Sequence, residues 1–341
     1  MLGGSRYRMR KFIKTNEFYV ALTIILLSVI IGSKSEAYFT AGNLIDLLRS
    51  SIEMGIFALG VLIVIVSGGI DVSFTAIATF SMFPTTKILY VNNYKGSVLL
   101  AFAISAAIGL FLGLINGSLI SYFKLPTLIV TLGTSSIYEG FLLTFVGNRE
   151  ISNVPQGMID YSKLNVIQVT DSRGIISGLP VSILIFLSLI IIVWLVLRYT
   201  MLGRGIYAIG GDRVSAERAG FNITAIQMFI YAFVGLISGI AGMVHTTMMR
   251  NSNPVSIIGT EMIIIAAVVL GGARITGGHG TILGTLLGLF LVIIMNNSLI
   301  LLGISSDWQR FVIGLLILIG TGITAYQSKK SRSTINKVLI E

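Results

Sequence analysis

The sequence predicts an all-α, polytopic membrane protein, a helical bundle of about ten spans with broken or re-entrant segments. Three observations predict it: 54% of the 341 residues are hydrophobic, the mean hydropathy is +0.91, and only 11% of residues are charged. Ordinary soluble domains carry about 25% charged residues. The remaining polar residues could not cover so much apolar surface. A soluble enzyme, a disordered chain and a nucleic-acid-binding domain are therefore excluded.

Ten apolar runs alternate with polar or glycine-rich segments. A bilayer core of about 30 Å needs roughly 20 apolar residues per helix, and shorter spans occur. We expect one transmembrane domain over 1–341, with a polar extracytoplasmic loop over 147–179. The expected spans are residues 18–31, 52–66, 74–90, 97–120, 127–146, 181–197, 223–244, 262–270, 282–302 and 311–326.

The net charge of +10 is concentrated outside the spans. Basic residues cluster in the N-terminal segment 1–16 and in the tail 327–341, and ten spans put both ends on one side. The other loops on that side also carry more Lys and Arg than those on the opposite side. Because cytoplasmic loops are enriched in basic residues, we expect both termini and segment 199–222 to be cytoplasmic. The predicted location is the cytoplasmic (inner) membrane of a prokaryote.

Two groups of glycines recur at four-residue spacing inside predicted spans. This spacing places small residues on one helix face, where another backbone can approach closely. The pattern predicts helix packing, with a direct role in a substrate path as the less favoured interpretation. The glycines concerned are Gly109, Gly113 and Gly117 in one group and Gly280, Gly284 and Gly288 in the other.

Helix-breaking segments at 67–71 and 271–278 adjoin apolar runs. Backbone that is not helical is tolerated at membrane depth only where protein or water satisfies it, and transporters build their pathways from such broken helices. Tight loops at the cytoplasmic surface are an equally good interpretation. The candidate pathway residues here are Gly68, Gly69, Asp71, Gly271 and Gly272.

Ionisable side chains in or near spans are costly and are functional candidates by default. They are Glu53, Asp71, Glu139, His245 and Glu261. Glu53 and Glu261 are expected at solvated helix ends, and Asp71 can also be a cap of the next helix. Glu139 lies well inside a span and is the strongest pathway candidate. With no cysteine and two distant histidines, the sequence predicts neither a metal site nor a bound cofactor.

The segment 203–220 predicts a short cytoplasmic helix. Asp212 is suited to be its N-cap, 214–219 gives about two turns, and Gly220 suits a left-handed stop. The helix is interpreted as a docking element, and a solvated loop with one helical turn is the alternative. Its candidate coupling residues are Asp212, Arg213, Ala216, Glu217, Arg218 and Gly220. No G-x-x-x-x-G-K-[ST] phosphate loop occurs in the chain, so ATP and Mg²⁺ would bind a partner.

Four stretches, in the same order as in the family pattern, resemble the ribose/galactoside/autoinducer-type permease subunits of ATP-binding-cassette (ABC) importers. They are GGIDVS (68–73), LPTLIVTLGT (125–134), AIGGDRVSAERAG (208–220) and AAVVLGG (266–272) running on to GGHGTILG (277–284). The resemblance implies a type II importer fold with about ten spans and an inverted internal repeat. It also implies a second permease subunit, identical or different, two cytoplasmic ATPases and an extracytoplasmic solute-binding protein.

A permease subunit that catalyses no reaction, in an ATP-driven sugar importer, is therefore the predicted function. A nucleoside or branched-chain amino acid permease is the alternative within the superfamily. An ion-coupled secondary transporter remains open, with Glu53, Asp71, Glu139 or Glu261 binding the coupling ion. An intramembrane enzyme is disfavoured, because the sequence shows no nucleophile with a base or metal beside it.

Overall fold

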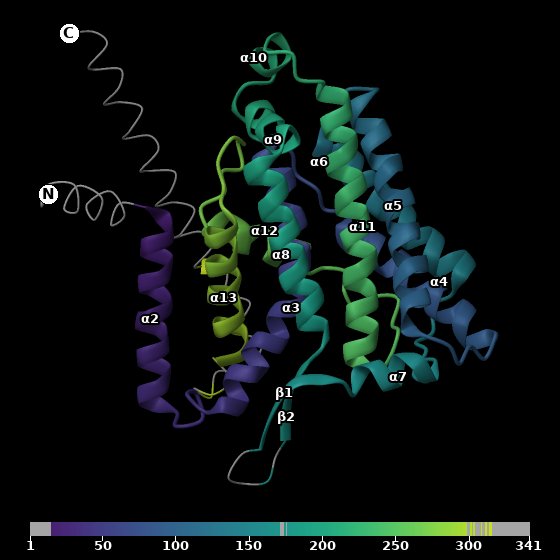
Figure 1. The fold of residues 1–341 in the computed structure, drawn as a ribbon, viewed down its shortest axis with the longest axis vertical. Helices are drawn as coiled ribbons and strands as arrows, with labels where there is room; N and C mark the ends of the chain where they lie inside the picture. Colours follow the sequence, from purple (N-terminus) through teal and green to yellow (C-terminus); the bar gives the residue numbers. More distant parts are fainter. Residues whose placement is uncertain are drawn as a thin grey trace, which may run out of the picture.

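The computed structural model describes residues 15–170, 174 and 176–298, and a few single residues between 301 and 315. Over this part the chain forms a helical bundle (Figure 1). Its elements are α2 (Asn16–Lys34), α3 (Ala41–Val66), α4 (Phe74–Val91), α5 (Val98–Ser121), α6 (Thr127–Phe141), the π-helical η1 (Leu142–Val146), α7 (Gln156–Ser162), β1 (Asn165–Thr170), β2 (Ile176–Pro180), α8 (Ser182–Tyr199), α9 (Met201–Gly211), α10 (Arg213–Arg218), α11 (Ile223–Met249), α12 (Glu261–Leu270) and α13 (Ile282–Ser298).

Within the described residues, six helices are long and apolar enough to cross a membrane: α2, α3, α5, α6 with η1, α8 and α11. Helices α4, α12 and α13 match the third, eighth and ninth expected spans. The protein is thus a multi-pass membrane protein, and the expected helical fold is confirmed. Most of segment 1–16, the end of the ninth span, nearly all of the tenth span at 311–326 and the tail 327–341 lie outside the described residues.

Helices α3 and α11 form the centre of the bundle. Every residue over 55–66 of α3 is buried, as expected for a helix surrounded by others rather than by solvent or lipid. Helix α11 packs against α5, α4 and α3, whereas α2 packs against α13 at the periphery. Only Val20 and Ile31 of α2 are buried. The apolar runs therefore predict where the spans are. Only the burial seen in the structure shows which spans are central in the bundle and which are peripheral.

The two ends of the bundle differ in structure. Helices α9 and α10 lie at one end, and α7 with the β1–β2 hairpin lies at the other (Figure 1).

Several helices begin at a residue whose side chain accepts a hydrogen bond from a backbone N–H group of the first turn, as an N-cap does. These caps are Thr40, Ser97, Thr200, Asp212 and Asn222.

Two local elements depart from the expectations. The expected polar loop at 147–179 contains α7 and an antiparallel hairpin, whose β-branched residues favour extended backbone. Segment 201–211, which was not predicted as helical, forms α9. Its glycines argue against a helix locally, but a Cβ on Gly203 would meet the Val196 carbonyl oxygen and one on Gly205 would meet Ile226. Close packing therefore outweighs low helix propensity.

Candidate functional site

The expected short helix is present as α10. Asp212 Oδ1 accepts the backbone N–H of Ser215 at 2.7 Å, and Gly220 follows the helix with a φ of +88°. Hydrogen bonds from the Ser215 side chain and backbone lower the pKa of Asp212 below its usual value. The helix therefore has the N-cap and the left-handed stop that the sequence predicts.

The surface of α10 is almost entirely exposed. Ala216 is the buried residue of this helix, whereas Glu217 and Arg218 are exposed and their side chains have no partner among the described residues. Arg213 reaches Gln227 Oε1 at the long distance of 3.5 Å. The helix thus has one anchoring side chain and a charged outer face available to a partner.

Both glycine-rich breaks meet the end of α9. Gly278 donates its backbone N–H to the carbonyl of Val66, the last residue of α3, at 2.8 Å. A Cβ on Gly210 would meet that same carbonyl oxygen, and a Cβ on Gly277 would lie 2.8 Å from the Cα of Gly68. We call Gly68, Gly210, Gly277 and Gly278 the glycine junction. It joins α9 to α3 and to the connection between α12 and α13.

Further hydrogen bonds hold this end of the bundle together. Tyr207 of α9 donates its hydroxyl to the carbonyl of Gly280 at 2.8 Å. At the start of α2, Asn16 Nδ2 donates to the Leu270 carbonyl at 2.8 Å, and Glu17 Oε1 accepts from the Thr281 hydroxyl at 3.0 Å. The segment between α12 and α13 is therefore held by both α9 and α2.

The four glycines proposed for the pathway lie in different surroundings. Gly68 belongs to the glycine junction, and a Cβ on Gly69 would lie 2.8 Å from the Tyr231 hydroxyl. Gly271 lies against Gly284, and Gly272 lies beside Asn16 with a φ of +102°. The second break thus reaches the first through Gly277 and Gly278 rather than through Gly271 and Gly272.

Asp71 is the centre of a buried polar network. Its Oδ1 accepts the backbone N–H and the hydroxyl of Ser73, both at 2.7 Å. Asn116 Nδ2 donates to Ser73 Oγ at 2.8 Å, and Tyr138 donates its hydroxyl to Asn116 Oδ1 at 3.2 Å. Asp71 Oδ2 is buried and has no partner among the described residues. The carboxylate thus organises the start of α4, α5 and α6 together.

Sequence reasoning singled out Asp71 but not Asn116 or Tyr138. Both lie inside predicted spans, 45 and 67 positions beyond Asp71 in the chain. An asparagine inside a predicted span was the available signal, because interhelical hydrogen bonds commonly involve such residues.

The first turns of α4 and α12 touch inside the bundle. Thr75 is fully buried and donates its hydroxyl to Glu261 Oε2 at 3.1 Å. The same oxygen accepts the Gly259 N–H at 2.9 Å. Helix N-termini carry partial positive charge, so Asp71 and Glu261 offset two such ends that face each other. Glu261 lies at a helix end, as expected, and is half-buried there. It also links the first turns of two broken spans.

Glu53 forms a second, partly buried polar cluster with His245. Because α3 begins at Ala41, Glu53 lies well inside this helix rather than near its end as expected. His245 Nδ1 lies 2.7 Å from Glu53 Oε2, and its Nε2 lies 3.0 Å from Ser256 Oγ. The cluster ties α3 and α11 to the segment 250–260 that leads into α12.

Glu139 lies on a partly exposed face of α6. It is half-buried and has no hydrogen bond or ion pair from its side chain among the described residues. Gly133 and Gly140 on the same helix have nothing within 4 Å of an added Cβ. Glu139 therefore borders a side of α6 that the other described residues leave open, and Gly133 and Gly140 lie on that open side roughly 100–120° further round the helix.

The first glycine group brings α5 against α11. A Cβ on Gly109 would meet the carbonyl oxygen of Gly235, and one on Gly113 would meet that of Tyr231. Gly117 is close to Met228, whose Cα would lie 3.3 Å from the added Cβ. The backbones thus approach as closely as the four-residue spacing predicts.

The second group lies against α12 and α3. A Cβ on Gly284 would meet the Gly271 carbonyl oxygen, and one on Gly288 would meet that of Ala267. Gly280 precedes α13, and a Cβ there would lie 2.8 Å from a Val66 methyl carbon. Gly284 and Gly288 therefore pack α13 on α12, whereas Gly280 packs beside the glycine junction.

Comparison with known proteins identifies the family. Residues 43–320 match the family described as branched-chain amino acid transport system / permease component. The chain belongs to this family of permeases. It is 33% identical to a ribose import permease protein of Bacillus subtilis, over 87% of this chain and 89% of that protein. A ribose import permease protein of Haemophilus influenzae is 29% identical over 96% and 98%. A fructose import permease protein of Bifidobacterium longum is 31% identical over 88% and 87%. No solved structure matches the permease.

Proposed function

We propose that this permease is the membrane subunit of an ATP-driven importer that moves a ribose-like pentose, a hexose or a related small sugar into the cytoplasm. It works with a second permease subunit, two cytoplasmic ATPases that bind ATP and Mg²⁺, and an extracytoplasmic solute-binding protein. The end of the bundle with α9 and α10 faces the cytoplasm, together with both termini. The permease itself catalyses no reaction.

The glycine junction carries this proposal. Helix α10 offers the charges of Glu217 and Arg218, which have no partner in the described part of the chain. Helix α9 meets both helix breaks through Gly210. An ATPase that binds α10 can therefore move the ends of α3 and of the α12–α13 connection together. Closely packed backbone transmits such a displacement, because tightly packed interiors have low compressibility.

The exposed face of α6 supports a second permease subunit. A half-buried carboxylate that faced lipid would be costly, and Glu139 has no partner within the described part of the chain. Small residues such as Gly133 and Gly140 allow close approach of another helix. We place the pathway where this face meets the second subunit, with Glu139 in contact with water or sugar.

The similar proteins, rather than the geometry of this permease, favour a sugar as the substrate. The family description mentions branched-chain amino acids, but the relatives with nearly full-length coverage are ribose and fructose import permeases. A branched-chain amino acid is therefore the second candidate substrate.

Uptake in reconstituted vesicles tests the proposal. The permease, a cassette ATPase and a solute-binding protein of the same organism, and ATP inside the vesicles are combined, and uptake of labelled ribose is measured. Unlabelled ribose, fructose and leucine are added as competitors, and permease alone under proton and sodium gradients is the control.

We expect saturable uptake that needs all components and ATP, with competition by a sugar. Uptake of labelled leucine in a parallel assay, without uptake of labelled ribose, would assign an amino acid substrate. Uptake by the permease alone, driven by an ion gradient, would contradict the importer and indicate a secondary transporter.

A further inference from the structure

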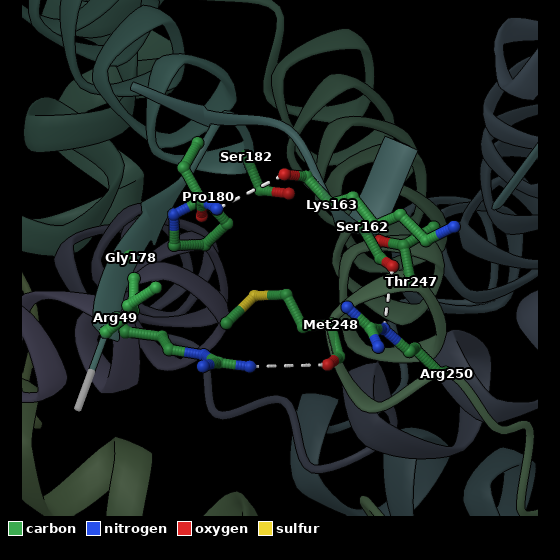
Figure 2. Close-up of a pocket in the computed structure, with 11 residues that line it drawn as sticks. Arg49, Ser162, Lys163, Gly178, Pro180, Ser182, Thr247, Met248 and Arg250 are labelled. Atoms are coloured by element: carbon green, nitrogen blue, oxygen red, sulfur yellow. Dashed lines mark hydrogen bonds between the residues drawn. The ribbon is translucent and has the colours of Figure 1, made fainter. Parts of the chain in front are cut away.

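A polar pocket of about 270 Å³ lies between α3, the end of α11 and the α7–hairpin segment. Figure 2 shows Arg49, Lys163 and Arg250 around it, with Met248 between the two arginines. These three cations come from three separate parts of the chain, and no Asp or Glu lines the pocket. The site thus concentrates positive charge that tertiary structure alone brings together.

The two arginines are held in place but keep most of their donors. Arg250 Nε donates to Ser162 Oγ at 2.8 Å, and Arg49 Nη2 donates to the Met248 carbonyl at 3.5 Å (Figure 2). A guanidinium has five N–H donors, so each arginine has four left for a ligand. Lys163 makes an exposed contact of 3.7 Å with Asp160, a pair of little strength.

The backbone also fixes Arg250. This residue follows α11 with a φ of +55°, a left-handed conformation that is uncommon outside glycine. Its side chain is thereby directed from the helix end to Ser162 rather than along the helix. Arg250 is therefore preorganised, which reduces the entropy that binding at this residue must overcome.

The pocket lies at the end of the bundle opposite α9 and α10. Its walls include Ser162, Lys163 and Asn165, which belong to α7, to β1 or to the residues between them. The β1–β2 hairpin projects past the end of α11 (Figure 1). On the orientation given under the proposed function, this end is extracytoplasmic. A protein outside the membrane can approach it directly.

We propose that this pocket is a docking site for acidic side chains of the extracytoplasmic binding protein, with Arg49, Lys163 and Arg250 as its cationic partners. The inference rests on the proposed function, because it requires such a partner. A carboxylate matches the planar guanidinium and can accept two parallel N–H bonds. A lipid headgroup phosphate would also lie just outside the apolar spans, so the experiment below includes anionic lipid to separate it from a protein carboxylate. Charge pairs of this kind raise association rates and weaken as salt increases.

The test measures binding of the protein identified in the uptake experiment to the complete permease–ATPase complex in lipid nanodiscs. The variants are Arg49→Gln and Arg250→Asn, the latter because asparagine tolerates a left-handed conformation. Lys95→Gln is the matched control: Lys95 is exposed and lies at the same end, since Gly157 of α7 contacts the neighbouring Gly96. ATPase co-purification, read at the opposite end, reports correct folding.

We expect each arginine variant to weaken binding about tenfold or more and to flatten its salt dependence, with Lys95→Gln unchanged. Arg250→Glu should also weaken binding, and it should regain affinity when one acidic surface residue of the partner is changed to lysine.

The measurements are made in phosphatidylcholine with and without phosphatidylglycerol. A loss seen only with phosphatidylglycerol would overturn the proposal in favour of a lipid headgroup site, and unchanged binding would also overturn it. If the wild type transports sugar without binding this protein, only the docking inference fails. If it neither binds nor transports, the proposed function fails as well.

Discussion

The backbone N–H of Gly278 donates to the carbonyl of Val66 across 2.8 Å, which joins two helix breaks that lie more than 200 positions apart in the sequence. Val66 ends α3, so its carbonyl would otherwise be one of the unsatisfied groups at a helix C-terminus. A backbone group from the second break satisfies it, and Gly210 of α9 lies against the same bond.

Gly210→Ala should disrupt this contact. Its Cβ would meet the Val66 carbonyl oxygen and the Gly278 nitrogen, and overpacking of this kind typically costs about 1–3 kcal/mol. We expect reduced sugar uptake per ATP hydrolysed, measured in reconstituted vesicles. Gly211→Ala is the control, because nothing lies within 4 Å of its added Cβ. Equal coupling in both variants would contradict the role of the glycine junction.

Gly113→Leu should separate α5 from α11. Even a Cβ at this position would meet the Tyr231 carbonyl oxygen, so the two backbones must move apart. We expect a lower yield of folded protein and a lower Tm, both measured in detergent. Ala107→Leu on the exposed side of α5 makes a similar increase in size and should keep both values near wild type. Normal assembly of Gly113→Leu with reduced transport would favour a pathway role instead.

Asp71→Asn should be better tolerated than Asp71→Ala. Both hydrogen bonds from Ser73 go to Oδ1, and an asparagine carbonyl oxygen can accept them as well. Alanine removes the acceptor and leaves buried donors unpaired, at a cost of about 1–3 kcal/mol. The measurements are Tm and transport. An Asn variant that folds normally but does not transport would show that the charge itself is required.

Asp212 should make the order of α10 depend on pH. Its pKa is lowered in the folded protein, so its contribution to the helix is complete above the unfolded value of about 3.9. That contribution is lost as the pH falls through the folded pKa. Hydrogen exchange of amides over 213–218, corrected for intrinsic rates, measures it. We expect protection in wild type to fall at acidic pH, whereas Asp212→Asn stays constant and Asp212→Ala is weak throughout. A wild-type profile like that of Asp212→Asn would contradict the cap.

The sequence by itself determined the spans that the structure describes and the short helix at 213–218. The apolar runs at 74–90 and 262–270 appear as α4 and α12, because transfer of apolar residues from water depends on local composition. The Asp212 cap and the Gly220 stop form between residues close in the chain. Such features need no information about distant segments.

Only the tertiary structure decided which broken segments meet. Glu53 pairs with His245, and Thr75 with Glu261, over separations of 192 and 186 positions. These partners share no periodicity that a single sequence displays, so composition leaves each carboxylate as an isolated charge. Packing decides which partner each carboxylate has, because a polar group removed from water needs a hydrogen-bond partner and takes the one that the fold places beside it. The pocket of Arg49, Lys163 and Arg250 arises in the same way, from three helix and loop ends that packing brings together.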